Sequence, residues 1–336
     1  MIRSTSARLR LARFAVPAVA ACAAVALAVP ASAASAASAA AASPAVIATV
    51  GVGNGPLGVA VNTETNDIYV VNARANTVSV IDAWRNFVAS TIHVGRAPHG
   101  VATDSRRDYF YVTNTLDNTV SVIDGQNNDV VDTIPVGVHP VGVAVDVPSD
   151  TIYVANFDSN TVSVIDGYTD EVVDTIRVGA QPSGLVEDPA TDTVYVTNSA
   201  ADTVSVIDGY TDCVIATVKV GMEPLALGLS TSTNYVYVSN YADNTVSVID
   251  GDTNKVVATV KVGKKPYQVA VSPLGHRIYV ANFAGNTVSV ISEDNGGVVG
   301  TIRVGDAPFG VMVDRLNGHI YVTNSGGKSI SVIAGD

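Results

Sequence analysis

The apolar residues after residue 43 fall into short runs that are separated by polar turns. Residues 138–179 contain four such runs, at 141–145, 152–155, 161–165 and 172–178. Each run has the length of a strand and is rich in Val, Ile, Thr or Tyr, whereas Asp, Asn, Gly, Pro and Ser dominate between the runs. The pattern predicts four antiparallel strands joined by tight turns, and no segment of this region shows the period of a helix.

The four-strand unit recurs seven times at intervals of 42 residues. A proline from Pro56 onward and the glycine of a Val-Gly pair from Gly53 onward keep this interval. So does a Tyr-Val-x-Asn tetrapeptide, which begins at Tyr69, Tyr111, Tyr153, Tyr195, Tyr237, Tyr279 and Tyr321. Four strands in a unit of about 40–45 residues are typical of a propeller blade. The sequence therefore predicts an all-β fold, a seven-bladed β-propeller with four antiparallel strands in each 42-residue blade.

The two ends of the repeat region predict how the ring closes. The last copy stops at Ala334 after its third strand, and a strand-like run at 45–50 precedes the first copy. We expect this N-terminal strand to complete the last blade, because closure removes the two edges that an open array would leave. A β-solenoid is the alternative repeat architecture, but its repeats are shorter and lack four strands per turn.

The first 43 residues have the organisation of a secretory leader. Four arginines precede an apolar run at 14–29, and small residues follow at 31–33. This order is typical of a signal peptide, so we expect residues 1–33 to be cleaved, 34–43 to form an Ala/Ser-rich linker and 44–336 to form a single propeller domain. The apolar run is short for a membrane span, and no second run follows it. The protein is therefore expected to be secreted, or to lie at the cell surface or in the periplasm, with no transmembrane span in the mature chain.

Cys22 offers a different localisation, because the segment ending at this residue resembles a lipobox in which the cysteine carries a lipid anchor. The apolar run continues past Cys22, which favours cleavage over lipidation. Cleavage would leave Cys213 as the only thiol, so no internal disulfide is expected.

The net charge of the chain restricts the classes of partner that the protein is expected to bind. The chain has 31 acidic and 19 basic residues, and loss of the leader with its four arginines leaves 15 basic residues and a formal charge of −16. Such a charge opposes binding to nucleic acid, which requires a basic surface. The 47% hydrophobic content excludes a disordered chain. We expect a soluble, monomeric globular protein.

The motifs resemble those of the YVTN-repeat β-propeller family. Tyr-Val-Thr-Asn occurs at 111–114 and 321–324, and Pro-x-Gly-Val-Ala-Val, Ile-Tyr-Val-x-Asn and Asn-Thr-Val-Ser-Val-Ile-Asp recur with variations in all seven units. The resemblance implies an exported bacterial or archaeal propeller, and it says little about activity because one fold hosts many functions. Related seven-bladed propellers include lactonases and streptogramin-type lyases, but the histidine and glutamate arrangement expected of a lyase is not found.

Three repeated residue types have predicted structural roles. The glycine of Pro-x-Gly should lie where the inner strands crowd, because it permits close backbone approach. The repeated asparagine should end the second strand and bond the following loop through its amide. The seven tyrosines should pack between blades with their hydroxyls at a polar edge.

Positions that vary within the constant frame predict where a ligand binds. The loop between blades and the loop after the repeated asparagine open on one face, around the channel mouth. Aromatic and cationic residues gather there, and pockets favour apolar walls with few polar groups. The candidate ligand-binding residues are Arg74, Arg96, His99, His139, Glu223, Lys264, Lys265, Tyr267, Phe283 and Phe309.

This pattern favours a non-enzymatic binding or interaction scaffold for a protein, a glycan or a small molecule, because no catalytic set is recognisable. One alternative is a lactonase- or lyase-like enzyme that uses His99, His139 and Glu223 at the channel. A second is single-stranded nucleic-acid binding by stacking rings and cations, which the charge of −16 opposes. No cofactor is predicted, although His99 and His139 lie on neighbouring inter-blade loops and could meet as a metal site at the mouth.

Overall fold

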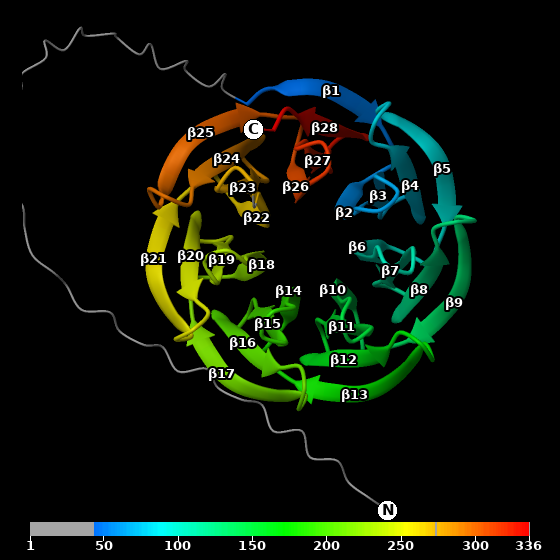
Figure 1. The fold of residues 1–336 in the computed structure, drawn as a ribbon, viewed down its shortest axis with the longest axis horizontal. Coiled ribbons are helices and arrows are strands. Elements are labelled where there is room, and N and C mark those ends of the chain that lie inside the picture. The colour runs from blue at the N-terminus through cyan, green and yellow to red at the C-terminus, as the bar shows by residue number, and fades with distance from the viewer. Residues whose placement is uncertain (1–43, 273, 336) are drawn as a thin grey trace, which may run out of the picture. The chain divides into compact units, whose positions relative to one another are not determined.

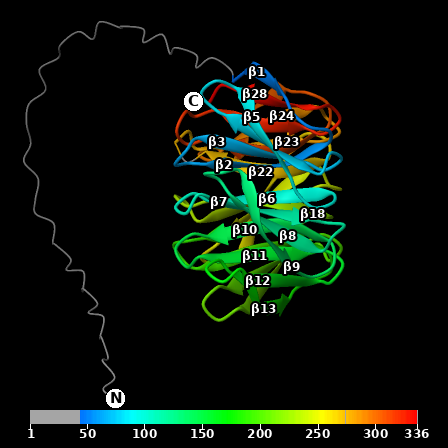
Figure 2. The same ribbon diagram turned by 90° about the vertical axis from the view of Figure 1, so that its right-hand side faces the viewer.

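The computed structural model of the protein describes residues 44–272 and 274–335. These residues form seven four-stranded antiparallel sheets that are arranged as blades around a ring, and they contain no helix (Figure 1). Figure 2 shows the same blades edge-on, with outer strands β5 (Phe87–His93), β9 (Asp129–Pro135) and β13 (Glu171–Arg177) toward the viewer. The predicted leader, the linker and Cys22 lie outside the described residues, so cleavage and lipidation remain predictions.

Each blade runs from an inner strand at the channel to an outer strand at the rim. The inner strands are β2 (Pro56–Asn62), β6 (Pro98–Asp104), β10 (Pro140–Asp146), β14 (Pro182–Asp188), β18 (Pro224–Ser230), β22 (Pro266–Ser272) and β26 (Pro308–Val313). The second strands are β3 (Asp67–Asn72), β7 (Tyr109–Asn114), β11 (Thr151–Asn156), β15 (Thr193–Asn198), β19 (Tyr235–Asn240), β23 (Arg277–Asn282) and β27 (Ile320–Asn324).

The third strands are β4 (Thr77–Asp82), β8 (Thr119–Asp124), β12 (Thr161–Asp166), β16 (Thr203–Asp208), β20 (Thr245–Asp250), β24 (Thr287–Ser292) and β28 (Ser329–Ile333). Besides β5, β9 and β13, the outer strands are β17 (Cys213–Lys219), β21 (Lys255–Lys261), β25 (Gly297–Arg303) and β1 (Val46–Gly51). Blade 1 comprises β2–β5, and blades 2 to 6 follow in chain order. Blade 7 combines β26, β27 and β28 with β1. The seven-bladed, all-β prediction is confirmed.

Strand β1 closes the ring. It pairs antiparallel with β28, with Thr49 opposite Ser331 and Val50 opposite Ile330. The amide of Ala334 extends the pairing by donating to the carbonyl of Ala45 at 3.0 Å. The first and last segments of the propeller are therefore held in one sheet, as the position of the N-terminal run predicted, and no blade lacks its fourth strand.

The repeated tyrosines fill the spaces between blades. Tyr69 and Tyr153 are fully buried, and Tyr69 stacks on Phe110 of blade 2 with ring centroids 3.8 Å apart. Tyr321 accepts a hydrogen bond from the amide of Asn317 at 3.3 Å. Burial raises the pKa of these phenols, for Tyr195 to about 12, because the charged form would lose its hydration. The predicted packing role is confirmed.

The glycine of Pro-x-Gly lies where inner strands approach each other closely. A Cβ at Gly58 would stand 2.6 Å from the carbonyl oxygen of His99, and one at Gly184 would stand 2.7 Å from that of Leu225. Both carbonyls belong to the next blade. A side chain at either glycine would collide with the next blade, which confirms the predicted crowding at these two positions. Blades 5 and 6 have Ala226 and Gln268 at the equivalent position.

The repeated asparagine makes contacts beyond those predicted for it. The Asn156 amide donates to Thr161 Oγ1 at 3.1 Å and to Ser163 Oγ at 2.9 Å, both on the third strand, and the same pair of bonds recurs in all seven blades. Because the intervening turn places Asn156 opposite Thr161, the side chain reaches past the loop to the strand. The position of the Asn156 side chain also explains the glycine of the repeated Val-Gly pair, since a Cβ at Gly137 would lie 2.5 Å from Asn156 Cγ.

Candidate functional site

The inner strands surround a cavity of about 380 Å³ along the propeller axis. Its walls are mostly aliphatic, because valine, alanine and leucine occupy most inward positions of the strands. Polar side chains are few, and they lie at the two ends of the inner strands: His99, Ser183, Gln268 and Tyr267 at the first end, Thr103, Glu187 and Arg315 toward the second. A small-molecule site has this composition, with apolar walls and a few polar groups that fix orientation.

Four rings meet at the first end of the channel, and we call Tyr241, Tyr267, Phe309 and His99 the aromatic mouth. Tyr267 packs on Phe309 with ring centroids 3.8 Å apart, and Tyr241 meets Tyr267 edge-on at 6.2 Å. His99 contacts Phe309 edge-on at 5.4 Å. Blade 1 lies between the blades that carry Phe309 and His99, so these two rings reach toward each other across the mouth.

Charged groups flank the aromatic mouth. Lys265 Nζ lies 4.4 Å from the centre of the Tyr241 ring, which is cation–π geometry. Burial raises the pKa of Tyr267, and the nearby Tyr241 and Glu223 raise it further. Burial lowers the pKa of His99 to about 4, although a hydrogen bond to the Val141 backbone opposes that shift. At neutral pH the His99 imidazole is therefore neutral.

The loops that carry these residues share one backbone geometry. His139, Glu223 and Lys265 each adopt a left-handed conformation, with φ of 53–55°. Each of their amides donates to an Asn or Asp side chain of the preceding blade, at 3.0 Å for His139, 2.9 Å for Glu223 and 2.8 Å for Lys265. A side chain from the neighbouring blade thus stabilises a conformation that is otherwise unfavourable for these residues. The backbone is fixed while the side chain varies from blade to blade.

Two predicted residues are paired away from the mouth. Arg96 Nε donates to Asp117 Oδ1 at 2.5 Å, and His139 Nδ1 contacts Asp158 Oδ2. His139 is not among the residues that line the channel, whereas His99 is. The structure does not bring these two histidines together. No group of three His, Cys, Asp or Glu side chains able to hold a metal occurs in residues 44–272 and 274–335.

The remaining predicted residues lie on the loops around the mouth. Arg74 and Lys264 are exposed, and Phe283 is half-buried on the turn that follows β23. Phe309 is 8% exposed, so Tyr267 and His99 cover most of its ring. The predicted ligand-binding residues are therefore divided into two groups. The first is an aromatic cluster with Lys265 and Glu223, and the second, Arg74, Lys264 and Phe283, surrounds that cluster.

Glu187 lines the second part of the channel and was not among the predicted site residues. The other blades place an aliphatic residue or threonine at this position of the inner strand: Val61, Thr103, Val145, Leu229, Val271 and Val313. Burial, together with the nearby carboxyls of Asp146, Asp188 and Asp192, raises the pKa of Glu187 to about 8. Comparing the seven repeats position by position would have found this carboxyl as the exception.

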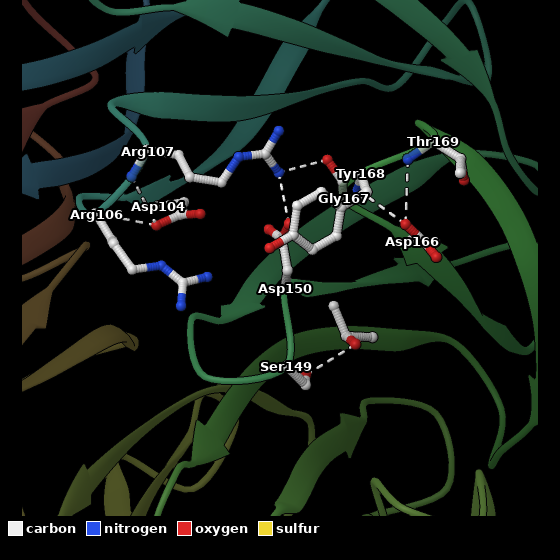
Figure 3. A network of polar contacts seen from close by, with 10 residues as sticks. Asp104, Arg106, Arg107, Ser149, Asp150, Asp166, Gly167, Tyr168 and Thr169 are labelled. Carbon is white, nitrogen blue, oxygen red and sulfur yellow. Dashed lines mark hydrogen bonds and ion pairs between the residues drawn. The ribbon is translucent and has the colours of Figure 1, made fainter.

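Arg107 forms a polar cluster that joins blades 2 and 3 (Figure 3). Its Nη1 donates to Asp150 Oδ2 at 2.6 Å and to the carbonyl of Gly167 at 2.5 Å. The guanidinium also lies 5.0 Å from the ring centres of Tyr109 and Tyr168. Other blades have Thr, Ser, Gly or Asn at this position. Tyr109 belongs to blade 2, like Arg107 itself, whereas Asp150, Gly167 and Tyr168 belong to blade 3. The cluster therefore connects the two blades.

Replacing Arg107 with alanine should destabilise the propeller by about 2–3 kcal/mol, because the Asp150 side chain is 1% exposed and would lose its counter-charge. Thermal unfolding followed by circular dichroism should show a loss of about 5 °C. Arg85→Ala is the matched control, since its ion pair with Asp82 is exposed and contributes little. Equal losses of unfolding temperature in Arg107→Ala and Arg85→Ala would contradict the assignment of the Arg107 cluster as a connection between blades.

Comparison with known proteins supports the fold. Residues 180–336 match the YNCE-like beta-propeller family. A chain of the hydrazine synthase of Kuenenia stuttgartiensis has a similar structure, with a TM-score of 0.75 and 20% sequence identity over 83% of this chain and 95% of that one. A search of curated proteins found no match. At this identity the structural likeness shows the fold alone.

No helix long and apolar enough to cross a membrane occurs in the described part of the chain. The blades, the ring closure and the family match over the C-terminal part of the chain agree with the repeated motifs. They are consistent with the resemblance to the YVTN-repeat proteins, and the described residues form a seven-bladed β-propeller.

Proposed function

We propose that the protein is an exported, non-enzymatic binding scaffold that takes its ligand at the aromatic mouth of the channel. The observation that carries the proposal is the cluster of four rings flanked by Lys265 and Glu223. Aromatic faces next to a few charges favour ligands with one apolar face and polar edges, such as a glycan or a protein segment. The export part of the proposal rests on the predicted leader.

The rigidity of the loops supports binding through a preformed surface. The left-handed residues at the mouth are held by side chains of the preceding blade, so little backbone order has to be gained when a ligand binds. Preorganisation of this kind lowers the entropy cost of association. The variable side chains then determine what is bound.

The two alternatives have less support. His99 is neutral at pH 7, but its pKa of about 4 makes it a weak base for a lyase or lactonase reaction. Single-stranded nucleic acid would need free cations. Arg96 is paired with Asp117 and Lys265 lies over Tyr241, and this leaves Arg74 and Lys264 as exposed cations among the predicted residues.

The proposal predicts that ligand binding depends on Tyr241. Native mass spectrometry of the purified protein, together with a glycan array, should identify a bound molecule or a bound glycan. Tyr241→Ala should weaken that binding about tenfold, because one aromatic contact contributes about 1 kcal/mol or more. Tyr210→Ala is the matched control, because Tyr210 is 89% exposed on an outer hairpin. This variant should bind the ligand as the wild type does.

Two outcomes would overturn this assignment. Equal binding by the Tyr241→Ala and wild-type proteins would remove the ligand from the aromatic mouth. Lactone hydrolysis that disappears in His99→Ala would replace the scaffold with the enzyme alternative.

A further inference from the structure

We propose that the channel binds an aliphatic organic ammonium ion, with the carboxylate of Glu187 as its anionic partner. This site is separate from the aromatic mouth, so the proposal does not rest on the function proposed above. It accounts for Glu187, which has the one carboxyl group among the described residues that line the cavity.

The position of Glu187 within β14 separates it from the mouth. Ser183 lies at the mouth end of this strand and Glu187 lies four residues further along, and both line the cavity. A strand rises about 3.3 Å per residue, so the two levels are about 13 Å apart. A ligand at Glu187 therefore occupies the second part of the channel.

Glu187 has no structural partner that explains its place. Its Oε1 is buried, and no hydrogen-bond partner for it occurs among the residues that the structure describes. Placing a polar atom in an apolar wall without a partner is unfavourable. Six other blades avoid that cost at the same position. Because Oε1 is closed off from the cavity, a ligand there would donate its hydrogen bond to the other carboxyl oxygen, Oε2.

The electrostatic surroundings select a cation. The charged groups that act on Glu187 are the carboxyls of Asp146, Asp188 and Asp192, and they raise its pKa to about 8 after burial has made the largest contribution. Arg315 is exposed at the cavity edge and is not among the groups that shift the Glu187 pKa. His99, at the other end of the channel, is neutral. A positive ligand is therefore attracted by the three aspartates, and by Glu187 once that carboxyl has lost its proton.

The aliphatic walls of the cavity favour a ligand whose uncharged part is a hydrocarbon chain. Val143, Leu185 and Leu227 are among the aliphatic residues that line a cavity of about 380 Å³, which is within the range of small-molecule pockets. A divalent metal would need several oxygen ligands, about six to eight for Ca²⁺. One carboxylate among aliphatic side chains instead suits an ammonium group that carries a hydrocarbon chain.

The test is calorimetric titration of the purified full chain with n-hexylammonium at pH 6, 7, 8 and 9. Below pH 8 the Glu187 carboxyl must release its proton when the cation binds, since the bound form needs the carboxylate. The affinity should therefore rise about tenfold per pH unit up to about pH 8 and then level off. The ligand keeps its charge over this range, as a lysine side chain does.

Variants and ligand analogues show whether Glu187 is the partner. Glu187→Gln should bind n-hexylammonium at least tenfold more weakly and lose the pH dependence, and Glu187→Leu, which copies blade 5, should behave alike. Glu171→Gln changes an exposed carboxyl on β13 and should bind as the wild type does. Hexan-1-ol and hexanoate, which lack the positive charge, should bind at least tenfold more weakly to the wild type.

Several results would overturn the proposal. No binding of n-hexylammonium, equal binding by Glu187→Gln, or equal binding of hexan-1-ol would each do so. Calcium chloride that raises the unfolding temperature through Glu187 would replace the ammonium ion with a metal. Loss of binding in Tyr241→Ala alone would move the cation to the aromatic mouth, which leaves the scaffold proposal intact while this one fails.

Discussion

A chain that lacks residues 45–51 is expected to fail to form a stable propeller. These residues contain β1, the outer strand of blade 7, and the deletion would leave β28 with an unpaired edge. Val50, 6% exposed, would also leave the core that it shares with Tyr321 and Ile330. Lost backbone pairing at about 1 kcal/mol per bond, added to lost apolar burial, approaches the whole stability of a typical domain.

The deletion can be tested without a functional assay. Size-exclusion chromatography should show aggregated material, and thermal unfolding should show a transition lowered by more than about 10 °C or none. Deletion of residues 34–43, the predicted linker, is the matched control and should leave the transition unchanged. An unaltered unfolding temperature in both deletion variants would mean that ring closure by β1 contributes nothing to stability.

Adding the strand back gives a sharper result. A synthetic peptide with the sequence of residues 44–52 should dock on β28 by strand addition and restore part of the lost transition temperature. The restoration should increase with peptide concentration, because binding to the folded state stabilises it by mass action. A peptide in which Val50 is replaced by Asp should not restore it, since that side chain enters the core.

The repeat period made the architecture predictable. A spacing of 42 residues with four strand-length runs determines the number of blades, and the unmatched runs at both ends determine the closure. The glycines were predictable for the same reason, since only close backbone approach explains a residue without a side chain at Gly58 and its equivalents. These inferences depend on backbone spacing, which the repeat conserves from copy to copy.

The candidate site was less predictable because it depends on side-chain direction. His139 precedes the repeated proline and His99 follows it, so the two residues occupy different positions of the repeat. His139 Nδ1 contacts Asp158, whereas His99 packs on Phe309, and the repeat period alone does not give the direction of either side chain. Glu187 was not predicted because it lies within a strand and not in a variable loop, at a position where the other copies are aliphatic or threonine. The exception to the repeat carried the information there.

The second large effect is expected for Tyr153→Ala. Tyr153 is 1% exposed and packs against Val194, Val196 and Ile207 of blade 4. Removing an aromatic ring from such a site costs about 3–5 kcal/mol, because the lost burial adds to the cost of the cavity that remains. Thermal unfolding should show a loss of about 6–10 °C in a chain of this size.

The Tyr153→Phe variant distinguishes the contribution of the ring to stability from that of the hydroxyl. It keeps the packing and removes one polar group, so it should cost only about 0.5–1.5 kcal/mol. Equal losses in Phe and Ala variants would show that the hydroxyl, and not the ring, connects blades 3 and 4.

A double variant tests whether the ring unfolds as one unit. Tyr321 is equivalent to Tyr153 but packs between blades 7 and 1, so the two tyrosines share no neighbour in the hydrophobic core. Independent sites add their free energies, and Tyr153→Ala with Tyr321→Ala should lose the sum of the single losses in one cooperative transition. Two separate transitions would instead mean that the blades unfold in groups, as in an open repeat array. A single transition would show that closure by β1 couples interfaces on distant parts of the ring.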